Sequence, residues 1–243
     1  MPLLLRGLSP DGSERLSAPA RRSGPAAVLF DVDGTLVDSV DLHAEAWQRA
    51  LKKFGKDVPY EEVRRQIGKG GDQLIPTFLS KQEVERFGEA LDAFRAELFQ
   101  SEYRERARPF PDARELVARV RADGRRVALA SSGKEDDVAF YRELVGLDGL
   151  LDAATTSSDA EKSKPHPDIF EAALARTGEE ATNALAIGDS PWDAISAKRA
   201  GIRTVGVLCG GFPEADLRDA GCVAIYRDPA DLLARYAESP LAR

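Results

Sequence analysis

Two carboxylates two positions apart, Asp31 and Asp33, come directly after an apolar run, Ala26–Phe30. A short continuous apolar run of this kind is typical of a buried strand in a parallel sheet. In an open α/β sheet, ligands bind beyond the carboxyl ends of the strands, which is where this acidic pair would lie. Such a pair can bind a hard cation and can also present an oxygen as a nucleophile. An acidic turn without further function is the alternative, because Asp and Gly are ordinary turn residues.

Further strand patterns recur along the chain, with helical patterns between them. They cover Arg126–Ala130, Ala153–Thr156, Ala184–Ile187 and Thr204–Leu208, with Val223–Tyr226 as a candidate edge strand. Strands that alternate with helices form right-handed βαβ units and a parallel sheet. We therefore predict an α/β fold with a central parallel sheet.

Two helix boundaries are also predicted. Asp112, followed by Glu115 three positions later, indicates a helix start that resembles a capping box. Pro191–Ala200 reads as a helix that ends before Gly201, because glycine is favoured just beyond the last helical residue.

A long helical stretch interrupts the strand pattern between residues 40 and 107. Large apolar residues recur near a 3.6-residue period in Ala44–Phe54 and Lys81–Gln100, as expected for helices that bury one face. Prolines at 109 and 111 indicate the return to the core. We predict a helical insert, residues 40–107, within a core of residues 25–39 and 108–243. Residues 1–24, rich in Ser, Gly, Pro and Arg, are expected to form a flexible tail.

Four segments together resemble the motifs of the haloacid dehalogenase superfamily, in that family's order. They are Phe30–Ser39, Val127–Ser132, Lys162–Asp168 with its Lys164-Pro165 pair, and Ala184–Asp193 with its two acids. The similarity is to the capped subclass I, which includes phosphoglycolate phosphatases and β-phosphoglucomutases. It implies a Rossmann-like three-layer core with a small α-helical cap domain inserted at the position of the helical insert.

The resemblance also implies a role for each motif residue. Asp31 would be the nucleophile that forms an aspartyl-phosphate, and Asp33 the general acid–base. Lys164 would add a positive charge beside the nucleophile and the phosphate. Ser131 and the adjoining Ser132 would bind phosphate oxygens together with Lys164.

The same resemblance implies a Mg²⁺ ion as cofactor. Its ligands would be Asp31, the backbone carbonyl of Asp33, and Asp189. Asp193 could bind the ion through water or orient Lys164; an acid placed only to stabilise a helix N-terminus is the alternative.

Two residues of the helical insert are candidate substrate contacts. His43 could position Asp33 or the transferred group, and similar sugar-phosphate mutases also have a histidine near this point; a helix-surface or capping histidine is the alternative. Lys69 lies in the polar stretch Gly68–Asp72 and could face a substrate anion, although this stretch could also be a simple turn between helices.

Composition limits the partners. A net charge of −7 argues against nucleic acid, because phosphate backbones require a basic face. No apolar stretch approaches the roughly 18 residues of a membrane helix, so no membrane partner is expected. Two cysteines are too few for a disulfide framework and indicate reduced thiols in a cytoplasmic protein.

The leading hypothesis is therefore a Mg²⁺-dependent phosphatase for a small phosphorylated metabolite, such as a sugar phosphate or a phosphoglycolate-like acid. The presence of Asp33 favours phosphate chemistry over carbon–halogen cleavage. A β-phosphoglucomutase-type mutase is one alternative, although Gly188-Asp189 resembles the phosphatase pattern, whereas mutases carry Glu-Asp there. A phosphonate hydrolase would need an imine-forming lysine from Lys52, Lys53, Lys56 or Lys69. A silent binding module on the same fold is the remaining alternative.

Overall fold

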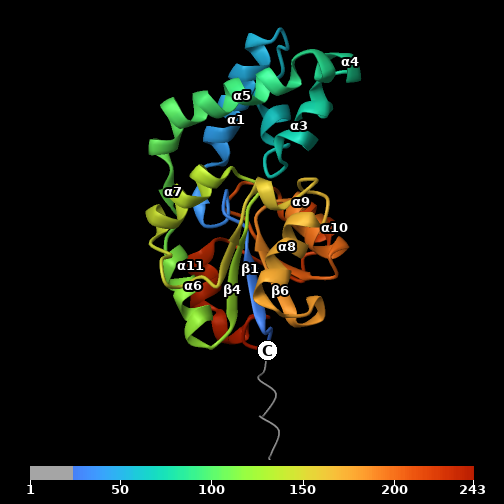
Figure 1. Ribbon diagram of the computed structural model, residues 1–243. Coiled ribbons are helices and arrows are strands. Elements are labelled where there is room, and N and C mark those ends of the chain that lie inside the picture. Colours follow the sequence, from blue (N-terminus) through green and yellow to red (C-terminus); the bar gives the residue numbers. More distant parts are fainter. Residues whose placement is uncertain (1–23) are drawn as a thin grey trace, which may run out of the picture.

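The computed structural model of the protein describes residues 24–243 (Figure 1). The predicted tail, residues 1–24, lies outside the described residues except for Gly24. The strands are β1 (Ala27–Phe30), β2 (Val37–Asp38), β3 (Arg108–Pro109), β4 (Arg126–Ala130), β5 (Ala153–Thr155), β6 (Ala184–Gly188), β7 (Arg203–Val207) and β8 (Ala224–Tyr226).

Helices occupy most of the remaining described chain. In the helical insert they are α1 (Val40–Lys53), α2 (Tyr60–Arg64), α3 (Gly71–Phe78), α4 (Lys81–Glu83) and α5 (Glu89–Leu98), with π-helical turns at Val84–Gly88 and Phe99–Tyr103 and a 3₁₀ turn at Arg104–Arg106. The core contains α6 (Ala113–Ala122), α7 (Glu135–Val145), α8 (Asp168–Thr177), α9 (Pro191–Arg199), α10 (Glu214–Ala220) and α11 (Pro229–Ala234), with 3₁₀ turns at Ser157–Asp159, Ala181–Asn183 and Tyr236–Glu238.

A parallel sheet in the order β5-β4-β1-β6-β7-β8 forms the centre of the described core. Each predicted strand is present, with ends that differ by at most one residue. The first strand, β1, lies between β4 and β6, and Phe30 is paired with Leu129 and Ile187. The last residues of these three strands therefore lie side by side at one edge of the sheet.

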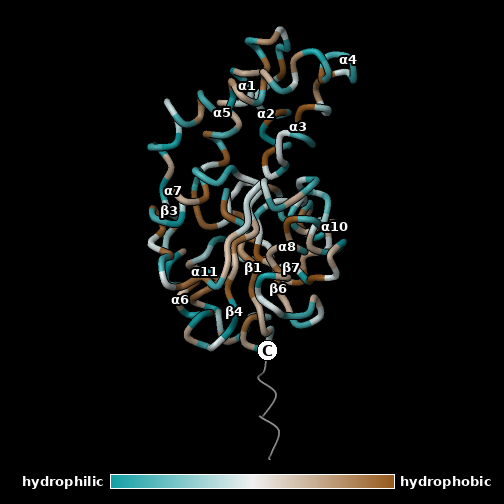
Figure 2. The backbone as a smooth tube through the Cα atoms, viewed as in Figure 1, coloured by the Kyte–Doolittle hydropathy of each residue, from teal (hydrophilic) through white to brown (hydrophobic). Residues whose placement is uncertain are grey.

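Two helical layers cover the sheet, one on each face. The residues of β1 are apolar on both faces because each face packs against helices. Val28 and Phe30 pack into a cluster with side chains of α6, α7 and α11, whereas Ala27 and Leu29 pack on the other face against α8 and α9. Figure 1 shows these two groups of helices on opposite sides of the strands, and Figure 2 shows apolar residues concentrated along the strands. A strand buried on both faces has no polar alternation, which agrees with the sequence of β1. The predicted three-layer α/β fold is confirmed.

The helical insert projects from the end of the core where β1 and β4 terminate (Figure 1). It has its own apolar cluster, in which Trp47 and Leu51 of α1 pack with Leu74 of α3 and Leu91 of α5. The chain leaves and returns through an antiparallel pair in which Val37 of β2 faces Pro109 of β3. The insert thus has its own apolar cluster, and its two connections to the core lie side by side. Both features support our proposal that residues 40–107 form a cap domain.

The expected capping box at Asp112 is wrong. Asp112 adopts a left-handed conformation, with φ of 56°, and its side chain makes no capping hydrogen bond to α6. A side chain caps a helix from an extended backbone, and this left-handed turn does not provide one. The predicted end of α9 is confirmed, since Gly201 follows the helix with φ of 77°.

Within residues 24–243, no helix combines the length and the apolar character that are needed to cross a membrane.

Replacing Leu29 by alanine should lower the free energy of unfolding, because this fully buried side chain packs β1 against α8 and α9. We expect a loss of about 2–5 kcal/mol, as for other buried leucines, measured by urea denaturation. Val223→Ala is the control: its side chain is 50% exposed, so its effect should stay within about 0.5 kcal/mol. Equal losses in the two variants would contradict the assigned core.

Candidate active site

The site lies where the central strands end. Asp31 follows β1, Ser131 follows β4 and Asp189 follows β6. Because these strands are parallel neighbours, the three residues reach the same edge of the sheet although they are far apart in sequence. The prediction that the acidic pair lies beyond the carboxyl ends of the strands is confirmed for Asp31.

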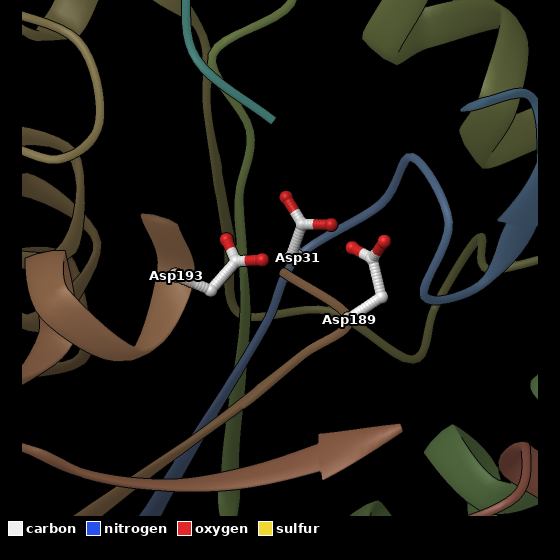
Figure 3. Close-up of side chains that lie close together, drawn as sticks. All are labelled: Asp31, Asp189 and Asp193. Carbon is white, nitrogen blue, oxygen red and sulfur yellow. The ribbon is translucent and has the colours of Figure 1, made fainter. Parts of the chain in front are cut away.

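Three buried carboxylates converge there. Asp31, Asp189 and Asp193 can each offer an oxygen within 4.8 Å of the others. Figure 3 shows the side chains of Asp31 and Asp189 facing each other across a short gap, with Asp193 on the other side of Asp31. All three residues are at most 6% exposed. Water therefore does little to screen the repulsion between their charges.

One buried cation, Lys164, lies between two of these acids. Its Nζ donates to Asp31 Oδ1 at 2.5 Å and to the carbonyl of Ala130 at 2.9 Å, and it is 2.8 Å from Asp193 Oδ1. Asp193 Oδ2 accepts hydrogen bonds from the backbone and hydroxyl of Ser190, which closes a capping box on α9. Asp193 therefore both contacts Lys164 and caps α9, two placements that the sequence left as alternatives. Its role in orienting Lys164 stays a prediction.

A single lysine does not balance three carboxylates. Burial and the charge of Asp193 raise the pKa of Asp31 to about 7, although Lys164 opposes this shift. Burial and the charges of Asp193 and Asp31 raise the pKa of Asp189 well above its usual range. Burial acts against the ammonium of Lys164, but the two acids outweigh it, so the pKa of Lys164 is raised. The site has a deficit of positive charge.

The residues present fit a divalent cation. Hard cations prefer carboxylate oxygens, and a bound ion would offset the repulsion between Asp31 and Asp189. The chain also keeps space around this pair, because a Cβ at Gly34 or at Gly210 would collide with the carboxylate of Asp189. The side chain of Asp33 is not part of this cluster; its predicted contribution, through the backbone carbonyl, stays a prediction.

Asp33 is held by one residue on each side of the boundary between the core and the helical insert. Its Oδ1 accepts a hydrogen bond from Ser39 at 2.6 Å and lies 2.9 Å from His43 Nε2. The hydroxyl of Tyr141, from α7, is 3.3 Å from the same nitrogen, and the His43 ring stacks on Phe99. Burial alone would raise the pKa of Asp33, but His43 and Ser39 outweigh it and hold its pKa below the usual range.

A cavity of about 300 Å³ opens over Asp31, between the core and the helical insert. Its lining includes Asp31, Asp33, His43, Trp47, Lys69, Asp92, Arg95, Ser132, Lys134, Asp137, Tyr141 and Lys164. Trp192 Nε1 donates to the carbonyl of Arg65, and Arg64 Nη2 donates to that of Gly210. These contacts join the insert to the core beside the cavity.

The remaining predicted site residues differ in their placement. Ser131 is buried, and its Oγ accepts from the backbone of Gly133 at 3.0 Å; it is not part of the cavity lining. Ser132 does line the cavity, and its hydroxyl has no partner among the described residues. Lys69 lines it too, but its ammonium donates to Gln66 Oε1 at 2.6 Å and lies over the Trp192 ring.

Several cavity residues were not identified from the sequence. Asp137 and Tyr141 come from one face of α7, and Arg95 comes from α5, where it lies over Trp47 and pairs with Asp92 at 3.1 Å. The four-residue spacing of Asp137 and Tyr141 places both on one helix face, but nothing in the sequence shows which face meets the cavity.

Known proteins resemble this chain over most of its length. The family model described as haloacid dehalogenase-like hydrolase matches residues 28–207. This chain belongs to that family. A Rhodospirillum rubrum phosphoglycolate phosphatase is 32% identical over 86% of this hydrolase and 89% of the relative. A candidate pyrophosphatase PpaX from Caldanaerobacter subterraneus is 31% identical over 77% and 83% of the two chains.

Solved structures show the same relationship. A Pseudomonas syringae hydrolase superimposes with a TM-score of 0.79 at 30% identity, over 87% of this hydrolase and 98% of that chain. A candidate β-phosphoglucomutase from Bacteroides vulgatus gives a TM-score of 0.79 at 24% identity, over 92% and 93%. The second similarity concerns the fold alone.

Removing one carboxylate should abolish stabilisation by metal. A ligand that binds only the folded state stabilises it by about 2.7 kcal/mol at 100 times its Kd, so saturating MgCl₂ should raise the melting temperature of the wild-type hydrolase. Asp189→Asn should lose this increase, because the neutral amide is a weaker ligand for a hard cation. Asp219→Asn, on α10 and outside the cavity lining, should keep it. An unchanged increase in Asp189→Asn would rule out Asp189 as a ligand.

Proposed function

We propose that this hydrolase is a Mg²⁺-dependent phosphatase that cleaves a small phosphorylated metabolite through an aspartyl-phosphate on Asp31. The observation that carries this proposal is the arrangement around Asp31. A cation, Lys164, is fixed on one oxygen of Asp31, a second acid is two residues away, and both acids open into one cavity. Phosphoryl transfer depends mainly on positioning and on neutralising charge, and this arrangement supplies both.

In the first step a carboxylate oxygen of Asp31 attacks phosphorus and the bond to the leaving oxygen breaks. Lys164 keeps Asp31 oriented through the 2.5 Å contact and offsets charge on the transferred group. The hydroxyl of Thr35 donates to Asp31 Oδ2 at 3.0 Å, which fixes the other oxygen. In the second step water cleaves the phosphorus–oxygen bond to Asp31, which releases inorganic phosphate and restores the carboxylate.

Asp33 acts as the general acid in the first step and as the general base in the second. It gives a proton to the leaving oxygen and later removes one from the attacking water. Because its pKa is lowered, Asp33 must take up a proton before it can act as an acid. His43 Nε2, at 2.9 Å, is placed to exchange that proton and to hold the carboxylate in position.

Asp31 and Asp189 would hold the Mg²⁺ ion, together with the backbone carbonyl of Asp33. When bound, the ion neutralises part of the repulsion between a phosphate dianion and the carboxylates. Ser131, Ser132 and Lys164 would bind phosphate oxygens, and Ser132 and Lys164 line the cavity. This assignment explains why Ser132 offers a free hydroxyl to the cavity.

The cavity supports a small substrate. A volume of about 300 Å³ lies at the lower end of the range for ligand pockets, about 300–1,000 Å³. The net charge of −7 opposes binding of nucleic acid. Cys209 and Cys222 are both free, which supports a reducing, cytoplasmic location.

A phosphomutase is the nearest alternative, and Gly188 argues against it. A Cβ at Gly188 would lie 2.5 Å from the Cβ of Asp193, so the Glu-Asp pair of the mutases does not fit this arrangement of Asp193 and Lys164. The test is the product: a phosphatase releases inorganic phosphate from a hexose 1-phosphate, whereas a mutase converts it to the 6-phosphate.

A phosphonate hydrolase is supported less well. Among the four lysines considered for an imine, Lys69 alone is in the cavity lining, and burial lowers its pKa. Its ammonium is engaged by Gln66 and Trp192, which leaves it poorly placed to attack a substrate carbonyl.

Asp31→Asn should abolish release of phosphate from p-nitrophenyl phosphate in the presence of MgCl₂, because the amide cannot form the acyl phosphate. We expect at least a 10³-fold loss of kcat, on the order of the losses seen when nucleophiles are removed, with an unchanged circular dichroism spectrum. Asp219→Asn should retain wild-type activity. Full activity in Asp31→Asn would reject this nucleophile, and an inactive wild-type protein would favour a silent binding module.

Asp33→Asn should lower kcat/KM, which reports the steps through departure of the leaving group, by about 10²- to 10⁴-fold on alkyl phosphates, because their leaving groups need a proton. The loss on p-nitrophenyl phosphate should be smaller, because p-nitrophenolate leaves without protonation. His43→Phe should reproduce this difference at lower magnitude if it positions Asp33. Initial rates on both substrates test this, and equal losses on the two would contradict acid catalysis by Asp33.

A further inference from the structure

Asp137 is a buried acid that the proposed mechanism does not use. It lies in the first turn of α7, its side chain is 5% exposed, and it lines the cavity. Its Oδ1 has no hydrogen-bond partner among the described residues. Buried polar atoms are nearly always paired, so an unpaired carboxylate oxygen at the wall of a cavity needs an explanation.

Stabilisation of the helix does not explain this burial. Acids in a first helical turn interact favourably with the helix dipole, but Glu135 and Asp136 precede Asp137 in the same turn and are exposed. They supply that charge without the desolvation cost that raises the pKa of Asp137. The unpaired oxygen therefore suggests a partner from outside the protein.

The surroundings of Asp137 place it on the leaving-group side of the site. The charges of His43 and Asp33 both act on Asp137. Tyr141, one turn further along α7, contacts His43. Since Asp33 would protonate the leaving oxygen, the carbon skeleton attached to that oxygen must lie near Asp33 and hence near Asp137.

We propose that Asp137 accepts a hydrogen bond from a hydroxyl group of the substrate, so that this hydrolase prefers phosphate esters of sugars or polyols. The inference rests on the proposed phosphatase function and names the substrate class of the same site. Asp137 is thus a specificity-determining residue that binds the leaving group.

A second anion fits this part of the cavity poorly. Phosphoglycolate and pyrophosphate would bring a carboxylate or phosphate towards Asp137 and Asp92. Part of the nearby positive charge already faces an acid of the chain, because Arg95 Nη2 pairs with Asp92 at 3.1 Å and Lys134 lies 3.8 Å from the same acid. An ammonium group fits poorly too, since Arg95 and Arg104 act on Asp137 with positive charge. A neutral donor, the hydroxyl group, meets both constraints.

The experiment compares kcat/KM for glucitol 6-phosphate, n-hexyl phosphate, 6-aminohexyl phosphate and phosphoglycolate. The wild-type hydrolase should prefer glucitol 6-phosphate. Asp137→Ala should lower kcat/KM for that substrate by about 10- to 100-fold, as expected for a lost hydrogen bond to a charged group. Its value for n-hexyl phosphate should change less than about threefold. Asp137→Asn, which keeps an acceptor oxygen, should recover part of the loss.

Asp136→Ala is the matched control, because it removes an exposed acid from the same helical turn. It should leave kcat/KM unchanged for both glucitol 6-phosphate and n-hexyl phosphate. Equal losses on glucitol and hexyl phosphate in Asp137→Ala would show a structural role and overturn the inference. A wild-type preference for phosphoglycolate, hexyl phosphate or aminohexyl phosphate would overturn it even if neither Asp137 variant folds. If no phosphate ester is hydrolysed, including p-nitrophenyl phosphate, the proposed function itself fails.

Discussion

The ammonium of Lys164 is the interaction on which the rest of the site depends. It links Asp31, after β1, to Asp193, in α9, and to the carbonyl that ends β4. Breaking a buried ion pair by removing one partner leaves an uncompensated charge and is strongly destabilising. The same contacts that offset the charge of Asp31, the proposed nucleophile, therefore also hold three separate chain segments together. One cation is still too little for three acids, which is why the site suits a second, divalent one.

The topology explains how one edge of the sheet acquires both chemistry and a closed cavity. Because β1 lies between β4 and β6, the residues that follow these three strands lie close together although they are far apart in the sequence. The helical insert leaves the core seven residues after Asp33 and returns at β3, so His43 and Trp47 are brought over residues that the sheet has already fixed. Catalytic positions thus come mainly from the rigid core, and the opposite wall of the cavity comes from the insert.

The sequence predicted those parts of the site that depend on strand ends. Asp31, Ser131 and Asp189 follow apolar runs, and the pairing of such runs in a parallel sheet brings their last residues together. Asp137, Tyr141 and Arg95 were missed because their position depends on how α5 and α7 rotate about their axes when they pack, which spacing alone does not determine. Asp112 was misjudged for a related reason: the tight entry into α6 imposes a left-handed backbone, and this local geometry overrides the preference of Asp for capping.

Charge is distributed unevenly in the cavity: the sheet edge differs from the side formed by α5 and α7. At the sheet edge, the uncompensated charges of Asp31, the proposed nucleophile, and of Asp189 and Asp193 favour cations. On the side of α5 and α7, Arg95 and Lys134 lie near Asp92, and the unpaired oxygen belongs to Asp137. Under the proposed function, a phosphate dianion would bind at the sheet edge, where a metal ion, Lys164 and Ser132 can contact it, and a neutral hydroxylated chain would bind beside α5 and α7. Because Asp137 belongs to α7 of the core, this part of specificity is fixed relative to Asp31 and does not depend on the position of the helical insert.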